Sequence, residues 1–279
     1  MPVGTGELIL KKMILLVVFC FMRADASPAD SAGFTETRLN DRVHIFHHAP
    51  WAETMTVVDA GPSLIVVDTW GSQKAADNAK VHIEAVFKKP VSHVINTHHH
   101  WDHTFGNQAF KIAMIVGQRF CAEDMRNSYG DPAMRKSKLK ESASLADNVS
   151  IRRYIQKVEQ ETAGDGFRLC PPKRPAGDRG ILSVGDLTIF LYHTPGIHTR
   201  SNMTVFIPEL GIVFGRREFA GAAQLKLEPG ADPAIIARVL EEILASGKSI
   251  QYLIPGHGDA VLNPDLYAVV KRLNGMDSK

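Results

Sequence analysis

The sequence predicts an α/β fold. The main evidence is a strand–helix–strand unit: residues 64–67 form an apolar run, residues 72–87 have helical apolar spacing, and residues 91–95 form another short strand. A second helix is predicted from its cap at Asp232 to Gly247. The 279-residue chain is 44% hydrophobic and 22% charged, which is typical of a globular protein rather than a disordered one.

The remaining elements follow from short apolar runs and helix caps. Further strands are predicted at residues 43–46, 56–58, 187–191, 203–207, 211–214 and 252–254. The buried stripe of the helix at 72–87 is predicted to consist of Ala75, Ala76, Ala79, Ile83 and Val86. A last helix is predicted to begin with Asn263 as its cap and Pro264 as its first residue.

Residues 119–180 differ in texture from the rest of the chain. They are charged and mostly helical in pattern, then become loop-like at residues 171–175. We interpret them as an insertion in a single domain that covers residues 27–279. Three aromatic residues of this insertion could face a substrate or could pack the insertion onto its own core: Tyr129, Tyr154 and Phe167.

The N-terminal segment predicts export. Lys11 and Lys12 precede a ten-residue apolar run at 13–22, and an Ala-Asp-Ala sequence follows at 24–26. This order is that of a secretory signal, so we expect residues 1–26 to be removed. A membrane anchor is disfavoured because ten residues cannot cross about 30 Å of hydrocarbon as a helix. The expected location is periplasmic or secreted, with no stable membrane anchor after cleavage.

Composition limits the partners and the redox chemistry. The net charge is +2, from 32 Lys and Arg against 30 Asp and Glu, so no basic field indicates a nucleic-acid partner. We expect a small-molecule substrate instead, and the sequence does not determine the oligomeric state. After cleavage two cysteines remain, Cys121 and Cys170, which either form a disulfide or stay as two buried thiols.

The 12 histidines are clustered. Residues 96–103 read Asn-Thr-His-His-His-Trp-Asp-His and follow the strand that ends at Ile95. His98 and His100 are two apart in extended chain and can therefore point the same way, whereas Asp102 and His103 reach a neighbouring point. Imidazole nitrogens and a carboxylate in this arrangement suit zinc. The run predicts a metal site at the end of a strand.

Two more histidines and the surrounding motifs carry a resemblance. His198 and His257 both follow short strands and lie in Gly-Pro turns. Residues 97–103 resemble the HxHxDH signature of the metallo-β-lactamase superfamily, and residues 64–69 resemble its apolar strand that ends in a structural Asp. The resemblance runs over residues 43–257. It implies a four-layer αββα sandwich with the metals at one edge of the two sheets.

The resemblance also implies the ligands and the chemistry. Carried over by position, the expected zinc ligands are His98, His100 and His198 for one ion and Asp102, His103 and His257 for the other. One or two zinc ions are expected, with two favoured. Zinc lowers the pKa of its bound water to near 7, so that a metal-bound hydroxide attacks the substrate carbonyl. Asp102 is the candidate catalytic residue, which orients that hydroxide and takes its proton.

The chain departs from the pattern of the Cys-bearing β-lactamases. Their zinc-binding Cys position holds Arg217 here, the position of their Lys holds Ala220, and Glu218 is the only acidic candidate nearby. Arg cannot ligate zinc because it stays protonated and offers only donors. Arg217 could bind a substrate anion, or could turn to solvent or pair with Glu218. The candidate substrate-binding residues are Arg217, Asn202 and Trp101.

Three functions fit these observations. The leading one is an exported zinc hydrolase that opens a β-lactam-like cyclic amide or an ester or lactone bond. A glyoxalase-II-like thioesterase is the second, favoured by His103 beside Asp102 and disfavoured because the bridging Asp of that group is absent. The third belongs to another class: a zinc-binding member of the superfamily that does not catalyse.

Overall fold

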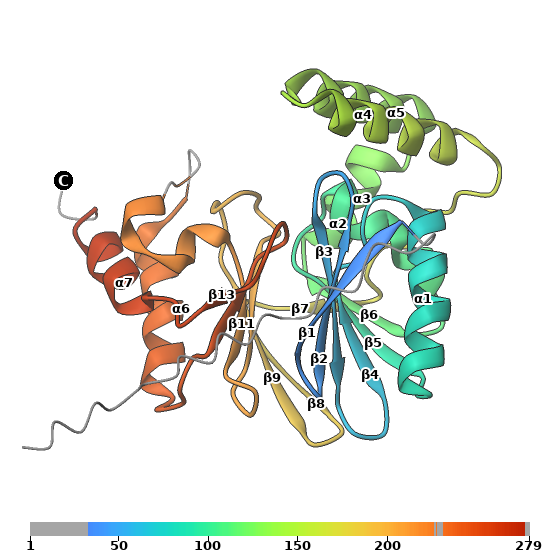
Figure 1. The fold of residues 1–279 in the computed structure, drawn as a ribbon. Helices are drawn as coiled ribbons and strands as arrows, with labels where there is room; N and C mark the ends of the chain where they lie inside the picture. The colour runs from blue at the N-terminus through green and yellow to red at the C-terminus, as the bar shows by residue number, and fades with distance from the viewer. Residues whose placement is uncertain (1–32, 226, 228–230, 277–279) are drawn as a thin grey trace, which may run out of the picture.

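A computed structural model describes residues 33–225, 227 and 231–276 of the chain. Two β-sheets pack face to face, with α1 on the outer side of one sheet and α6 and α7 on the outer side of the other (Figure 1). This arrangement confirms the αββα sandwich expected from the sequence. The predicted signal at residues 1–26 lies outside the described residues. Among the helices that are described, none has the length and apolar character needed to span a membrane.

The first sheet has seven strands in the order β1 to β7. The strands are β1 (Phe34–Asn40), β2 (Val43–His48), β3 (Glu53–Asp59), β4 (Leu64–Val67), β5 (Val91–Asn96), β6 (Met114–Gln118) and β7 (Arg174–Ala176). β1 to β4 are antiparallel, and β4 to β7 are parallel. The helix α1 (Gln73–Phe87) connects β4 to β5. The predicted strand–helix–strand unit is therefore confirmed as a parallel crossover.

The second sheet has six strands in the order β13-β12-β11-β10-β9-β8. The strands are β8 (Arg179–Val184), β9 (Leu187–His193), β10 (Met203–Ile207), β11 (Ile212–Phe214), β12 (Tyr252–Ile254) and β13 (Val261–Leu262). Two helices cover its outer face: α6 (Pro233–Ala245) and α7 (Leu266–Asn274). Only β11 and β12 run parallel in this sheet, and α6 lies between them in the chain.

Three apolar clusters hold the layers together. The central one lies between the sheets and joins residues such as Ile45 and Val67 of the first sheet to Val205 and Phe214 of the second. One outer cluster packs α1 on the first sheet, and the other packs α6 and α7 on the second. Because each sheet buries both faces, strands such as β4 and β10 are buried along their whole length, without alternation.

The helix predictions held except at two points. Ser72 caps α1 by accepting a hydrogen bond from the Ala75 amide, but Val86 is exposed, because Phe87 and not Val86 packs on the apolar cluster at the end of the helix. Asp232 caps α6 as predicted. The cap of α7 is Asp265 and not Asn263, because the Asp265 carboxylate accepts a hydrogen bond from the Ala268 amide, two residues further along than predicted.

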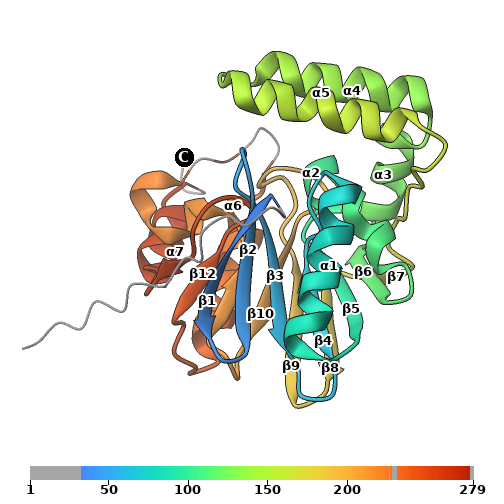
Figure 2. The same ribbon diagram turned by 45° about the vertical axis from the view of Figure 1, so that its right-hand side comes forward.

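The segment at residues 119–180 contains α3 (Cys121–Tyr129), α4 (Pro132–Leu145) and α5 (Val149–Ala163). α4 and α5 lie side by side as a pair above one end of the sandwich (Figure 2), and we call this pair the arm. The loop-like stretch that follows contains the short edge strand β7. Cys121 and Cys170 are both free thiols.

Candidate metal centre

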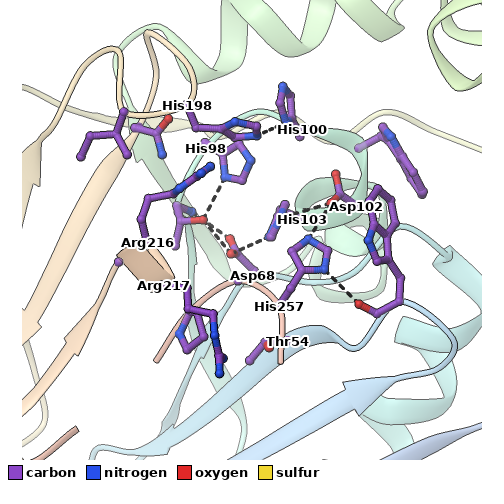
Figure 3. Close-up of a pocket in the computed structure, with 18 of the residues that line it drawn as sticks. Thr54, Asp68, His98, His100, Asp102, His103, His198, Arg216, Arg217 and His257 are labelled. Carbon is purple, nitrogen blue, oxygen red and sulfur yellow. Dashed lines mark hydrogen bonds and ion pairs between the residues drawn. The ribbon is translucent and has the colours of Figure 1, made fainter. Parts of the chain in front are cut away.

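The six expected ligands lie at the ends of strands on the side of the sandwich that the arm overhangs. His98 and His100 lie in the loop after β5, and Asp102 and His103 lie in the short helix α2 (Trp101–Thr104) that follows it. The other two come from the second sheet: His198 lies between β9 and β10, and His257 follows β12. The two sheets thus bring His98 and His257, which are 159 positions apart, to one site (Figure 3).

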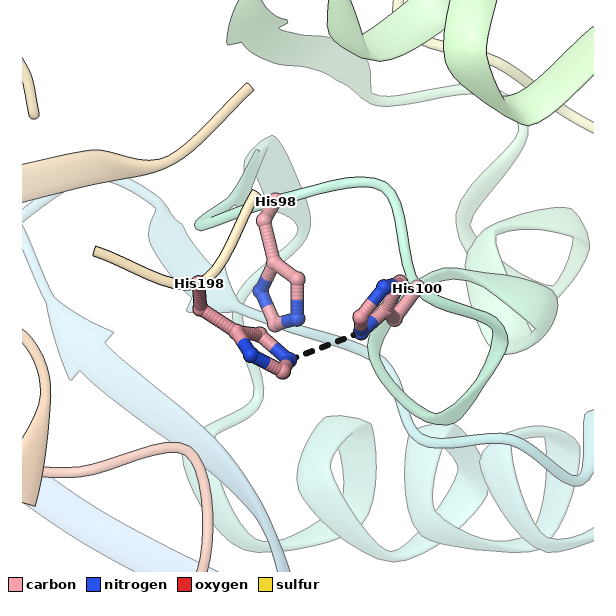
Figure 4. Close-up of side chains that lie close together, drawn as sticks. All are labelled: His98, His100 and His198. Carbon is pink, nitrogen blue, oxygen red and sulfur yellow. Dashed lines mark hydrogen bonds between the residues drawn. The ribbon is translucent and has the colours of Figure 1, made fainter. Parts of the chain in front are cut away.

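The first group consists of His98, His100 and His198. One ligand atom from each lies within 4.8 Å of the others, and His198 Nε2 is 2.9 Å from His100 Nδ1 (Figure 4). His98 Nε2 is buried and has no hydrogen-bond partner among the described residues. A buried nitrogen without a partner is costly, and three converging imidazole nitrogens are an arrangement that a metal ion satisfies.

The second group consists of Asp102, His103 and His257, whose ligand atoms also lie within 4.8 Å of one another. Asp102 Oδ2 is 3.0 Å from His257 Nε2 and 3.3 Å from His103 Nε2. The ring of His103 lies 4.3 Å from that of His98 between centroids, so the two groups adjoin. The arrangement therefore offers two neighbouring sets of three ligand atoms.

Outer partners orient the two histidines of the second group. His103 Nδ1 lies 2.9 Å from Asp68 Oδ2, and His257 Nδ1 lies 3.1 Å from the Trp51 carbonyl oxygen. Both partners are acceptors, so each Nδ1 carries a hydrogen and each Nε2 faces the site. The Asp68 carboxylate is held in turn by the amide and the hydroxyl of Thr97, at 2.8 and 2.7 Å.

Burial sets the charge state of the first group. It lowers the pKa of His98 well below its usual range, that of His100 to about 3, and that of His198 to about 4, where the Arg216 guanidinium also contributes. These imidazoles are therefore neutral at pH 7. Neutral imidazole is the form that ligates a metal, so no proton has to be removed first.

The second group favours positive charge. Burial opposes ionisation of both partners, but Asp102 and Asp68 outweigh it and raise the pKa of His103 well above its usual range. Burial likewise opposes the Asp102 carboxylate, yet His103 and His257 lower its pKa well below the usual range. The two buried carboxylates beside His103, Asp102 and Asp68, therefore stabilise a positive charge at this position.

The three predicted substrate-binding residues lie in different environments. All of them border one cavity of about 620 Å³ that also contains the six ligand candidates. Arg217 is exposed and donates to the Asp259 carbonyl oxygen at 3.2 Å. Asn202 is buried and closes the His198 loop by accepting a hydrogen bond from the Thr199 amide. Trp101 is only 3% exposed, and most of its indole packs beneath the arm.

Sequence reasoning missed several residues of this cavity. Arg216, and not Arg217, forms the ion pair with Glu218, at 2.6 Å. The Trp51 ring lies tilted by 45° to the His257 ring, with 5.1 Å between centroids. Neither carries a motif that could have indicated it. Tyr129, Tyr154 and Phe167 are buried together with Trp101 in one apolar cluster that joins the insertion to the body of the protein, and Tyr129 also borders the cavity.

Residues 49–215 match the family described as the metallo-beta-lactamase superfamily. A metallo-beta-lactamase from Erythrobacter litoralis, crystallised with beta-mercaptoethanol in its active site, is 17% identical; the match covers 90% of this chain and all of that one, with a TM-score of 0.60. A metallo-beta-lactamase from Pontibacter korlensis is 14% identical over 86% of this chain and 99% of that one, with a TM-score of 0.56.

A third structure of the same fold is a larger protein than these two, and its name gives a different activity. The stereoselective inverting sec-alkylsulfatase Pisa1 from a Pseudomonas species is 14% identical, and the match covers 86% of this chain but only 40% of that one, with a TM-score of 0.58. At these identities the three structures establish a shared fold and not a shared substrate.

Proposed function

Because the chain belongs to the metallo-beta-lactamase superfamily, we propose that it is an exported zinc-dependent hydrolase that opens a β-lactam-like cyclic amide or an ester or lactone bond. The observation that carries this proposal is the pair of adjoining ligand sets, which border a cavity large enough for a small molecule. Export rests on the sequence of the first 26 residues. A mass spectrum of the mature protein that includes residues 1–26 would contradict it.

The donors fit zinc. Five imidazoles and one carboxylate are nitrogen and oxygen ligands of the kind that zinc takes, and the buried Nε2 of His98 has no other partner among the described residues. His98, His100 and His198 would hold one ion. Asp102, His103 and His257 would hold a second, and we favour two because both sets of ligand atoms are complete. When bound, zinc supplies a Lewis acid and hydroxide at neutral pH.

Asp102 is the proposed catalytic residue. Its Oδ2 is engaged by His103 and His257, whereas no hydrogen bond from the described residues reaches its Oδ1. Its lowered pKa keeps the carboxylate ionised at pH 7, so Oδ1 can orient a water molecule and accept its proton. This role needs the carboxylate to stay fixed, which its two histidine neighbours ensure.

Arg217 is the proposed anion-binding residue of the cavity. Its guanidinium meets a carbonyl oxygen and no carboxylate among the described residues, so its charge is not neutralised by an ion pair. Arg216 cannot take this role as readily, because Glu218 holds its guanidinium through two hydrogen bonds of 2.6 and 2.9 Å. A substrate carboxylate near Arg217 would gain a charge-assisted hydrogen bond.

The test combines metal content with a substrate panel. Purified protein is analysed for bound zinc and then assayed with a chromogenic cephalosporin, a lactone and a thioester. We expect His100→Ala to lose zinc and both His100→Ala and Asp102→Ala to lower kcat/KM by at least about a hundredfold, since even outer partners of metal ligands contribute 10–100-fold. His93→Ala is the matched control, because His93 lies on β5 outside the site.

The outcomes separate the candidate functions. Preference for the cephalosporin or the lactone supports the proposal, and preference for the thioester favours the thioesterase alternative. A zinc-loaded protein that hydrolyses none of the three, and behaves like Asp102→Ala, would support the non-catalytic alternative.

A further inference from the structure

The cavity has a second part that the hydrolytic chemistry does not use. The residues that line the cavity run from the metal ligands to the arm. Figure 2 shows that the arm overhangs this end of the sandwich. Apolar side chains border this part from three segments: Trp51 from the loop between β2 and β3, Leu145 and Ala146 from the end of α4, and Ile151 from α5. We call these four residues the apolar subsite.

The apolar subsite begins directly beside the reacting centre. The indole of Trp51 lies 5.1 Å from the ring of His257 and 5.6 Å from that of Trp101, between centroids. A group attached to a carbonyl at the metal ligands would therefore meet Trp51 first and then the arm. Trp51 is half-buried, so part of its surface is left to contact such a group.

Three charged residues border the cavity beside the apolar subsite: Lys138, Glu141 and Asp147. Lys138 and Glu141, which border the cavity from α4, form an ion pair with each other at 2.9 Å. Leu145, one turn further along α4, is 77% exposed. An exposed leucine beside three partly buried apolar residues at the border of a cavity is typical of a surface that binds an apolar ligand.

The arm is fixed to the body of the protein, so the subsite is preformed. The Tyr154 hydroxyl on α5 donates to Glu53 Oε2 at 2.8 Å, and Ser72 donates to Glu161 at 2.8 Å. Trp101 Nε1 donates to the Ser142 hydroxyl of α4 at 3.3 Å. A preformed surface binds without the entropic cost of ordering the arm.

We propose that the apolar subsite binds a hydrophobic acyl or aryl substituent of the substrate, adjacent to the bond that is cleaved. The binding surface stands on the contacts above, and the statement about the cleaved bond rests on the proposed function. The preferred substrates are therefore amides or esters with a long aliphatic or an aromatic side chain, and small polar substrates are poor ones.

The first experiment measures binding without turnover. The fluorescent neutral probe N-phenyl-1-naphthylamine is titrated into metal-free and zinc-loaded protein. We expect Leu145→Ser and Ile151→Ser each to raise its Kd about tenfold, because each removes a large apolar side chain from the contact. Leu145 is exposed, so its replacement leaves the core intact.

Two matched variants control for non-specific binding. Leu262→Ser replaces another exposed leucine, 62% exposed on β13 and outside the cavity, and Val149→Ser replaces an exposed residue of the arm that does not border the cavity. Both should leave the Kd unchanged. Equal effects of Leu145→Ser and Leu262→Ser would overturn the proposal.

The second experiment measures turnover with acetyl, butyryl, hexanoyl and octanoyl esters of one alcohol. The kcat/KM should rise about fourfold for each methylene that the subsite buries, and Leu145→Ser should flatten this dependence. A protein that binds the probe as expected but hydrolyses neither these esters nor the cephalosporin nor the lactone overturns the proposed function and leaves the subsite supported. Hydrolysis that does not depend on chain length overturns the subsite and leaves the function supported.

Discussion

Replacing Tyr154 with Phe tests how the arm is attached. The Tyr154 hydroxyl donates to Glu53 Oε2 at 2.8 Å, and the Glu53 side chain is completely buried. Burial and this carboxylate raise the pKa of Tyr154 well above its usual range, so the hydroxyl keeps its proton and donates. Without it, Oε2 retains the Gly71 amide at 3.2 Å and His48 Nδ1 at 3.6 Å.

The expected cost follows from that environment. A hydrogen bond to a charged group contributes about 1.5–3 kcal/mol, and a buried carboxylate that loses a donor is poorly compensated. We therefore expect Tyr154→Phe to lower the free energy of unfolding by about 2–3 kcal/mol. For a chain of this size that corresponds to a decrease in Tm of about 4–12 °C. Thermal and urea unfolding measure both quantities.

Tyr192→Phe is the matched control. Tyr192 is also buried, but no hydrogen bond from the described residues reaches its hydroxyl, so the change should stay within about 0.5 kcal/mol. A double-mutant cycle with Glu53→Gln should give a coupling of at least about 1 kcal/mol between positions 53 and 154. If Tyr154→Phe and Tyr192→Phe have the same effect, or the coupling is zero, the reasoning is refuted.

Two further predictions concern groups outside the site. A hydrogen bond from His44 lowers the pKa of Glu36, helped by His82 and opposed by burial, so the ionised form contributes stability above the unfolded pKa of about 4.3 and loses it as the pH falls. Glu36→Gln should therefore lower stability by about 1–2 kcal/mol at pH 7 in urea unfolding. The difference should shrink as the pH falls through the lowered folded-state pKa of Glu36, and a difference that stays constant down to full protonation would contradict this. Burial raises the pKa of both thiols, Cys121 and Cys170, and Cys170 is the less completely buried of the two. Iodoacetamide at pH 8 should modify Cys170 before Cys121 in the native protein, which mass spectrometry can show. If neither cysteine reacts even after denaturation, the two form a disulfide instead.

The sequence predicted most of the fold where the signal is local. The cap and the apolar stripe of α6 are set by residues within one helix, and both are observed. The prediction for α7 was wrong because two adjacent polar caps compete: Asn263 adopts a left-handed φ of 49°, and the helix begins after Asp265. The edge strand β1 was missed because most of its residues are only partly buried and show no apolar alternation.

In the candidate site, too, the residues close together in the sequence could be predicted, and the contacts between distant residues could not. The ligand run at residues 96–103 is contiguous and follows a strand, so its position could be predicted from the chain alone. The contact between Glu53 and Tyr154 spans 101 residues, and a Glu and a Tyr at that separation form no pattern. The structure was needed to show that the insertion packs against the ligand loop through Trp101, and that the ion pair beside His198 involves Arg216.

The Pro-Gly-His-Gly sequence at 255–258 needs its two glycines for different reasons. Gly258 adopts a left-handed φ of 76°, which a residue with a side chain rarely accepts. Gly256 does not have a left-handed φ. It has to be glycine because a β-carbon there would lie 2.6 Å from His103 Cε1. The loop that carries His257 therefore rests directly against a ligand from the other sheet, and its backbone is fixed to β3 by the 2.9 Å hydrogen bond from the Thr54 amide to the Gly256 carbonyl. The motif thus sets the distance between the two halves of the second ligand group as well as presenting one of its histidines.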